Sequence, residues 1–138
     1  MAEYLADKSA LTRSEHRPEV RAVVEPLLLA GRIATCAIID LELLYSARDP
    51  AGYATLASAL RGMPRVPISE LVMERALEVQ RLLAARSQHR AVPLPDLIIA
   101  ACAEQHVLTV LHYDADFDLI AAVTGQKMRW VVPRGAVS

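Results

Sequence analysis

Short apolar runs alternate with amphipathic helical segments along this chain, and that alternation constrains the fold more than any other feature. The runs at residues 3–6, 33–36, 107–111 and 128–132 have the length of strands, and helical patterns separate them. Strands that alternate with helices are typical of an α/β domain with a central, mainly parallel sheet. With 138 residues, 54% of them apolar, the chain has the size and core of one domain.

Prolines, glycines and capping residues mark where the helices begin and end. Pro18 suits the first position of a helix and Gly31 suits a stop, while Ser69 is a capping residue. Ser9 is expected to cap a short turn after the first strand, and residues 66–68 to be briefly extended. We expect helices over about 18–29, 38–47, 51–60, 69–86, 95–105 and 115–123.

Four acidic residues each adjoin a strongly apolar stretch, where a lone carboxylate is costly unless it is paired or bound to a metal. This acidic quartet consists of Asp7, Glu42, Asp96 and Asp114. Two of the four follow predicted strands, and active sites of open parallel sheets lie outside the carboxyl ends of the strands. Glu42 has no Lys or Arg three or four positions away, whereas Asp40 is expected to be solvated. The sequence therefore predicts one acidic cluster.

A cluster of carboxylates without matching cations favours a hard divalent cation such as Mg²⁺. One or two such ions neutralise a phosphate, lower the pKa of a water and orient its in-line attack on a phosphodiester. No side chain then has to act as the nucleophile. The chain accordingly has no glycine-rich nucleophile elbow and no Cys–His pairing pattern.

Four segments, in this order, resemble the PIN-domain ribonucleases and, more narrowly, the VapC-type toxins of toxin–antitoxin systems. The resemblance implies a single PIN domain over residues 1–138, built as a three-layer α/β sandwich with a mainly parallel sheet between helices. It also implies a cytoplasmic Mg²⁺- or Mn²⁺-dependent endoribonuclease that hydrolyses a structured RNA, either tRNA or rRNA. A cognate VapB-like antitoxin that inhibits through the acidic site, and toxin homodimers, are implied as well. The four segments are residues 4–11, 36–48, 95–100 and 111–117.

Carried across by motif, the acidic quartet corresponds to the family's catalytic and metal-binding acids. Asp116 matches a frequent fifth acid, and Ser9 matches a small hydroxyl residue that contacts the metal's water or the substrate. Lys8 stands where the family commonly has Thr; it either approaches the acids or a phosphate, or points into solvent, which we favour. Arg48 either contacts RNA phosphate or complements a helix end. For His112 a structural or exposed position is favoured over the role of a general base.

Two other classes of function compete with this interpretation. One is an aspartate phosphotransfer domain, but a haloacid-type phosphatase requires a second Asp where Ser9 stands, and a receiver requires an acidic pair that is missing before the first helix. The other is a PIN-fold protein that binds RNA or a partner without catalysis. The presence of all four acids argues against that loss of activity.

Composition bears on the partners and the compartment. The formal net charge of −1 provides no global basic field, so contacts with nucleic acid must come from local patches. We expect a basic rim at the end of the long helix, formed by Arg81, Arg86 and Arg90. Tyr45 and Trp130 are expected in the core or an interface. The two cysteines, Cys36 and Cys102, are expected to be buried free thiols, which suits a reducing cytoplasm. We expect no signal peptide and no membrane span.

Overall fold

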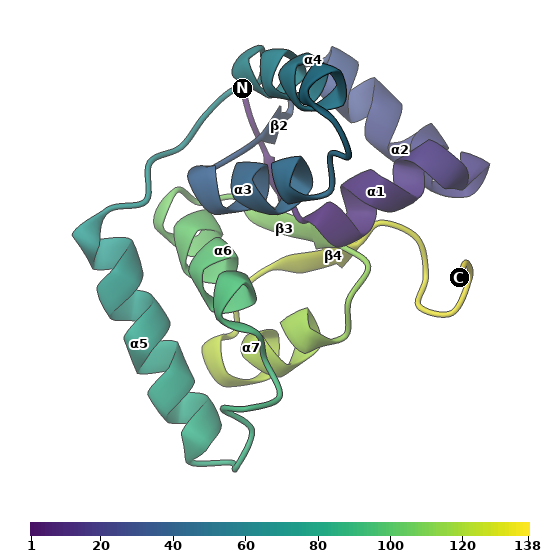
Figure 1. Ribbon diagram of the computed structural model, residues 1–138. Coiled ribbons are helices and arrows are strands. Elements are labelled where there is room, and N and C mark those ends of the chain that lie inside the picture. Colours follow the sequence, from purple (N-terminus) through teal and green to yellow (C-terminus); the bar gives the residue numbers. More distant parts are fainter.

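Four parallel strands form the centre of the molecule, in the order β2-β1-β3-β4. The computed structural model describes all residues, 1–138 (Figure 1). The strands are β1 (Tyr4–Ala6), β2 (Ile33–Ala34), β3 (Thr109–His112) and β4 (Met128–Trp130). The helices are α1 (Lys8–His16), α2 (Pro18–Leu29), α3 (Ala37–Tyr45), α4 (Pro50–Arg61), α5 (Glu70–Ala84), α6 (Leu94–Gln105) and α7 (Asp116–Thr124).

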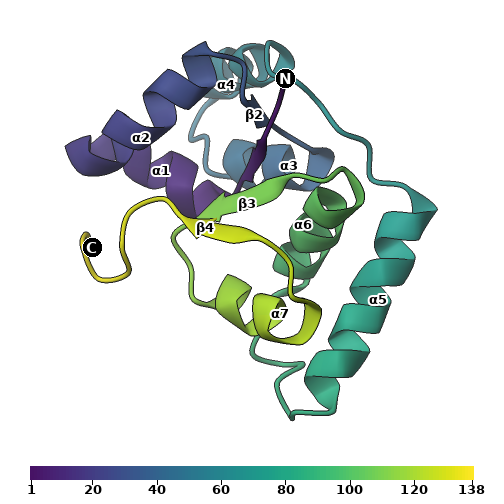
Figure 2. The same ribbon diagram turned by 180° about the vertical axis from the view of Figure 1, so that it is seen from behind.

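Successive strand residues face opposite sides of the sheet and so build two separate cores. Leu5 and Val110 belong to a cluster of 21 buried residues that they share with helices α3 to α7. Their neighbours Ala6 and Leu111 belong to a second cluster of eight, which includes residues of α1 and α2. Figures 1 and 2 show α1 and α2 together and α5 beyond α6. Helices on both faces of a parallel sheet make the expected three-layer α/β sandwich.

Most of the expected elements are present where their boundary signals placed them. Pro18 lies in the first turn of α2, and Gly31 follows that helix with φ +67°, a conformation that glycine adopts without strain. The Ser69 hydroxyl accepts a hydrogen bond from the backbone N–H of Val72 at 3.3 Å and caps α5. None of the helices is both long and apolar enough to cross a membrane.

The segment after β1 differs from the expectation that Ser9 caps a short turn. It is a nine-residue helix, α1, and its cap is Asp7, whose carboxylate accepts a hydrogen bond from the Ser9 backbone N–H at 3.0 Å. Asp7 occupies the extended position directly before the helix, where an Asp side chain satisfies a free N–H. The Ser9 hydroxyl instead accepts a hydrogen bond from the backbone N–H of Tyr113 at 2.9 Å.

The second strand is shorter than predicted. The bridge that follows it brings together the partners with which Asp40 is buried rather than solvated. Only Ile33–Ala34 form β2, after which Thr35 makes a bridge to Arg65. Asp40 lies in the first turn of α3, facing this bridge. Its carboxylate accepts a hydrogen bond from the Thr35 hydroxyl at 2.6 Å and pairs with the Arg65 guanidinium. The buried charge is thus satisfied by Thr35, five residues earlier in the chain, and by the more distant Arg65.

Candidate active site

The carboxyl ends of the four parallel strands lie at one edge of the sheet, and the acidic quartet gathers there. Asp7 directly follows β1, and Asp114 stands two residues beyond β3. The first turn of α6 contributes Asp96, and α3 contributes Glu42. Two acids therefore come from strand ends and two from helices, which is the arrangement expected from the sequence.

Asp96 lies at the centre of this group. Its burial, followed by the negative charges of Asp7, Asp114, Glu42 and Asp116, raises the pKa of its carboxyl to about 8. Burial and the neighbouring Asp114 also raise the pKa of Asp116. Ligand atoms of Asp96, Asp114 and Asp116 lie within 4.8 Å of one another. Close carboxylates disfavour each other's ionisation, so the site has more negative charge than its own cations balance.

Two oxygen atoms in the quartet are buried without a hydrogen-bond partner. They are Oδ1 of Asp7 and Oε1 of Glu42. The other oxygen of Asp7 caps α1, and that of Glu42 faces Lys8. Buried polar atoms are nearly always paired, so these oxygens indicate a missing partner of positive charge. Oxygen donors alone, several of them ionised, are the ligands that Mg²⁺ or Mn²⁺ prefers. The residues at the site therefore fit a hard divalent cation.

Lys8 does not point into solvent as expected. Its Nζ lies 3.3 Å from Oε2 of Glu42, although the side chain remains half exposed. The expectation that the acidic quartet lacks cationic partners is therefore wrong for Glu42. The two residues are 34 positions apart in the chain, so no helical spacing rule could reveal their contact. One lysine nevertheless leaves most of the carboxylates unbalanced.

His112 has a structural setting, in agreement with the favoured interpretation. The residue is completely buried, and its ring centroid lies 5.0 Å from that of Phe117 and 4.9 Å from that of Trp130. Its Nδ1 accepts a hydrogen bond from the backbone N–H of Asp114 at 3.1 Å. Burial lowers the pKa of the imidazole. A neutral His112 thus supports the backbone that carries Asp114.

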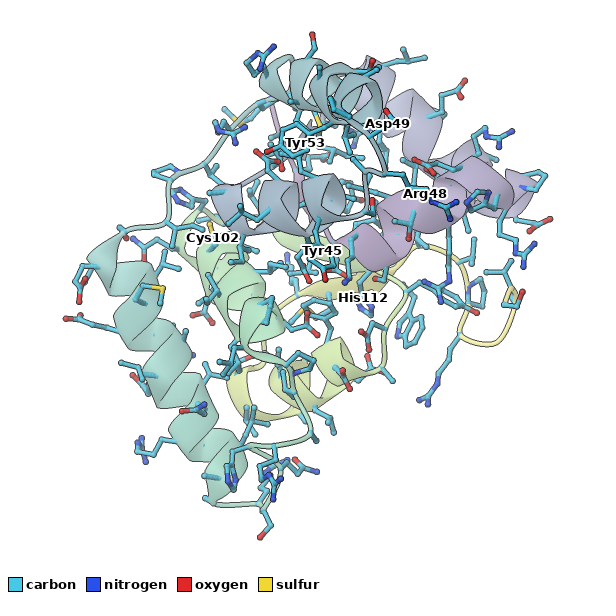
Figure 3. All side chains as sticks on the ribbon, in the orientation of Figure 1. Tyr45, Arg48, Asp49, Tyr53, Cys102 and His112 are labelled. Carbon is cyan, nitrogen blue, oxygen red and sulfur yellow. The ribbon has the colours of Figure 1, made fainter.

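The remaining predicted site residues divide into those at the cavity and those outside it. A cavity of about 590 Å³ opens beside the acids, and Ser9 lines it together with Glu42 and Asp114. Tyr45 stands at its edge with 92% of its surface exposed, so it is not in the core, and a place in an interface stays a prediction. Arg48 is exposed beyond the end of α3 and lines a different hollow (Figure 3).

Arg13 also lines this cavity, and sequence reasoning missed it. Its Nη1 donates a hydrogen bond to the Ser9 carbonyl at 2.9 Å, and its guanidinium carbon lies 4.6 Å from the centre of the Tyr113 ring. The one available signal was the position of Arg13 four residues after Ser9, which becomes a contact only when residues 8–16 are helical. Both acidic and cationic side chains therefore line this cavity.

Comparison with known proteins gives matches over most of the chain. The PIN domain family model matches residues 4–123. The chain is 52% identical over 134 residues to Ribonuclease VapC51 of Mycobacterium tuberculosis, a match that covers 97% of this chain and 96% of the relative. It is 47% identical over 133 residues to Ribonuclease VapC21 of the same species, covering 96% of each chain.

Solved structures with the same fold are known. A chain of the DNA-bound VapBC from Salmonella typhimurium superposes with a TM-score of 0.73 at 17% identity, covering 96% of this chain and 100% of that one. A chain of a toxin–antitoxin complex from Klebsiella pneumoniae gives 0.73 at 22% identity, covering 94% and 98%. These low identities establish the similarity of fold alone.

Proposed function

We propose that this chain, which belongs to the PIN-domain family and, within it, to the VapC ribonucleases, is a metal-dependent endoribonuclease that acts as the toxin of a toxin–antitoxin pair. One observation carries the proposal: four acids surround the buried Asp96, whose pKa rises to about 8, and they are Asp7, Glu42, Asp114 and Asp116. A purely structural role does not explain such mutual repulsion. The names of relatives at about half identity support ribonuclease activity.

Mg²⁺, or Mn²⁺ in its place, is the proposed cofactor. Asp96, Asp114 and Asp116 would hold it, since their oxygens are already close together. The unpaired oxygens of Asp7 and Glu42 would provide two further oxygen donors beside it. When bound, the cation supplies neutralisation of the phosphate charge and a lowered pKa for a water at the site.

The protein's own residues prepare the site for hydrolysis of a phosphodiester. Oδ1 of Asp7 and Oε1 of Glu42 are free acceptors that can hold the protons of an attacking water and so orient it. Lys8 offsets part of the negative charge at Glu42. Both cysteines are buried and free, as predicted, so no thiol reaches the substrate. Water is therefore the proposed nucleophile.

The substrate and partners follow from membership of the family. We propose a structured RNA, tRNA or rRNA, as the substrate and a VapB-like antitoxin as the inhibitor. We also propose a homodimer, to be checked by light scattering, and a location in the cytoplasm, where buried thiols stay reduced. The alternative is a PIN-fold RNA- or partner-binding protein without catalysis. The retained acids and their two free oxygens favour the enzyme.

Incubation with total RNA tests the proposal. We expect cleavage at discrete sites in Mg²⁺ or Mn²⁺, its loss in EDTA and its return when the metal is added back. Sequencing the new ends then identifies the RNA and the bases that flank the cut. The Asp96→Asn protein, made in parallel, controls for contaminating nucleases. Full activity in chelator would exclude the metal-assisted mechanism, and RNA binding without cleavage would favour the alternative.

A further inference from the structure

Three cationic side chains lie along α1, which begins at the cavity of about 590 Å³ beside the acids. We call this hollow the acidic cavity. Lys8 is the first residue of this helix, Arg13 lies in its last turn, and Arg17 comes directly after its end. At a rise of 1.5 Å per residue the line is about 13 Å long. We call Lys8, Arg13 and Arg17 the α1 track.

Two hollows lie along the α1 track and are joined by shared residues. The first is the acidic cavity, which Lys8 and Arg13 line. The second has a volume of about 290 Å³ and is lined by polar and charged residues alone, among them Arg13, His16 and Arg17. Thr12 and Arg13 border both hollows, so a chain-like ligand can continue from one into the other.

The two arginines of the track form no ion pair, which distinguishes them from several others in the protein. Arg65 and Arg75, for example, are each paired with carboxylates. The guanidinium of Arg13 is held instead by the Ser9 carbonyl and the face of the Tyr113 ring, and its Nε is buried without a partner. Arg17 donates to the hydroxyl of Ser138. These contacts orient both guanidinium groups without neutralising them.

We propose that the α1 track binds the RNA phosphates that flank the scissile bond. The inference rests on the proposed ribonuclease activity. An acidic site repels the polyanion that it must cleave, and a chain with net charge −1 can offset this only through local cations. Guanidinium groups bind phosphate oxygens through two parallel N–H donors. A line of cations about 13 Å long is longer than one phosphate group and can reach neighbouring phosphates of a single strand. The track therefore engages more than one phosphate.

The salt dependence of RNA binding tests the proposal, because each lost phosphate contact lowers the slope of log K against log salt by about 0.7 for a single strand. The probe is a short, fluorescein-labelled single-stranded RNA of mixed sequence, measured by anisotropy in Mg²⁺. Every protein carries Asp96→Asn, so that the RNA stays intact. We expect Arg17→Gln and Arg13→Gln each to weaken binding and reduce the slope by about 0.7, and the double variant by about 1.4.

Arg81→Gln is the matched control, since Arg81 is an exposed arginine in the last turn of α5, away from α1 in both views (Figures 1 and 2). Its affinity and slope should equal those of the parent protein. Thermal unfolding checks each variant. If Arg13→Gln disturbs Ser9 and Tyr113, Arg17→Gln still decides the test. The only hydrogen bond of the Arg17 side chain is to the hydroxyl of the terminal Ser138.

Cleavage by the protein with Asp96 intact is measured in parallel, so that the two hypotheses fail separately. Unchanged affinity and slope in both arginine variants, with active wild-type enzyme, would overturn the inference and leave the ribonuclease proposal standing. Reduced slopes with an inactive wild type would support the track and reject the nuclease. If the variants bound RNA normally but lost an acidic peptide of the antitoxin, the track would belong to the partner and the inference would be wrong.

Discussion

Asp96 is the residue at which the chemistry of the site is most visible. Its carboxyl has a pKa of about 8 against an ordinary value near 3.8, mainly because it is buried and secondly because other acids surround it. At neutral pH the metal-free protein therefore keeps a proton there. A divalent cation would displace that proton, since ligands must be ionised to bind. Proton and metal thus compete for one carboxylate.

This competition predicts how stability depends on pH. Between about pH 4 and pH 8 the folded protein holds the Asp96 proton while the unfolded chain has lost it, so rising pH favours unfolding. The thermal midpoint in EDTA should fall across this window, and Mg²⁺ should raise it most at the upper end. Scanning fluorimetry measures both series. Asp96→Asn should flatten the EDTA series, and coinciding midpoints with and without Mg²⁺ would argue against a tight cluster.

Variants that neutralise one acid of the quartet at a time should show the effect of its charge, because the side chain keeps its shape. Asp7→Asn, Glu42→Gln, Asp96→Asn and Asp114→Asn each remove a ligand charge, and we expect RNase activity to fall by at least ~100-fold because several kcal/mol of charge stabilisation are lost. Folding should persist even in Asp7→Asn, since the amide side chain keeps an oxygen that can cap α1.

Asp118→Asn is the control for these variants. Asp118 is exposed, and its carboxylate accepts a hydrogen bond from Trp130 Nε1 at 3.1 Å, which an amide oxygen can also accept. Its activity should equal that of the wild type. A quartet variant that is folded and cleaves RNA at the wild-type rate would have to be removed from the proposed site.

At the scale of elements, the sequence predicted the sheet and most helices because their signals are local. The strands are short apolar runs, and Pro18, Gly31 and Ser69 mark helix ends through backbone geometry. Helix α1 was not predicted because residues 8–16 include only two apolar side chains, Ala10 and Leu11, too few for an amphipathic pattern. Asp7, which caps this helix, also belongs to the acidic quartet, so one residue both marks a helix start and carries a charge of the site.

Contacts between elements lay beyond local signals. The acidic quartet could be expected to converge because parallel strands share a carboxyl edge. The pairing of Lys8 with Glu42 and of Arg65 with Asp40 depends instead on how α1 and the segment after α4 pack against α3. Neither pair follows from spacing along a helix or strand. Both pairs involve residues for which the sequence had suggested exposure to solvent.

The buried Asp40 predicts a stability effect that is independent of catalysis. Asp40→Ala would leave the buried Thr35 hydroxyl and the Arg65 guanidinium without their partner, so we expect a loss of about 1–3 kcal/mol in the free energy of unfolding. Urea denaturation measures it. Glu3→Ala is the matched control because the Glu3–Arg32 pair is about half exposed and should contribute less than about 1 kcal/mol. Equal losses would mean that burial of Asp40 adds nothing.

For the whole molecule, the acidic cavity is the proposed centre of activity and, in the same proposal, the point at which a partner suppresses it. Glu42 and Asp114 line its wall, and Asp7 and Glu42 retain free oxygens. An arginine from the partner's disordered tail would pair with these carboxylates through its planar fork and exclude both metal and substrate phosphate. The tail would become ordered only on binding, beside the site.

Growth of producing cells tests this mode of inhibition. Production of the chain alone should arrest growth, and co-production of its antitoxin, expected from the adjacent small reading frame, should relieve the arrest. Asp7→Asn should be harmless without the antitoxin because it removes a charge at the sheet edge, yet it should still copurify with the antitoxin through contacts outside the cavity. An antitoxin whose tail arginine is changed to alanine should bind but no longer protect. Equal toxicity of wild type and Asp7→Asn would show that the arrest does not come from this site, and full protection by the alanine variant would exclude the arginine as the inhibiting group.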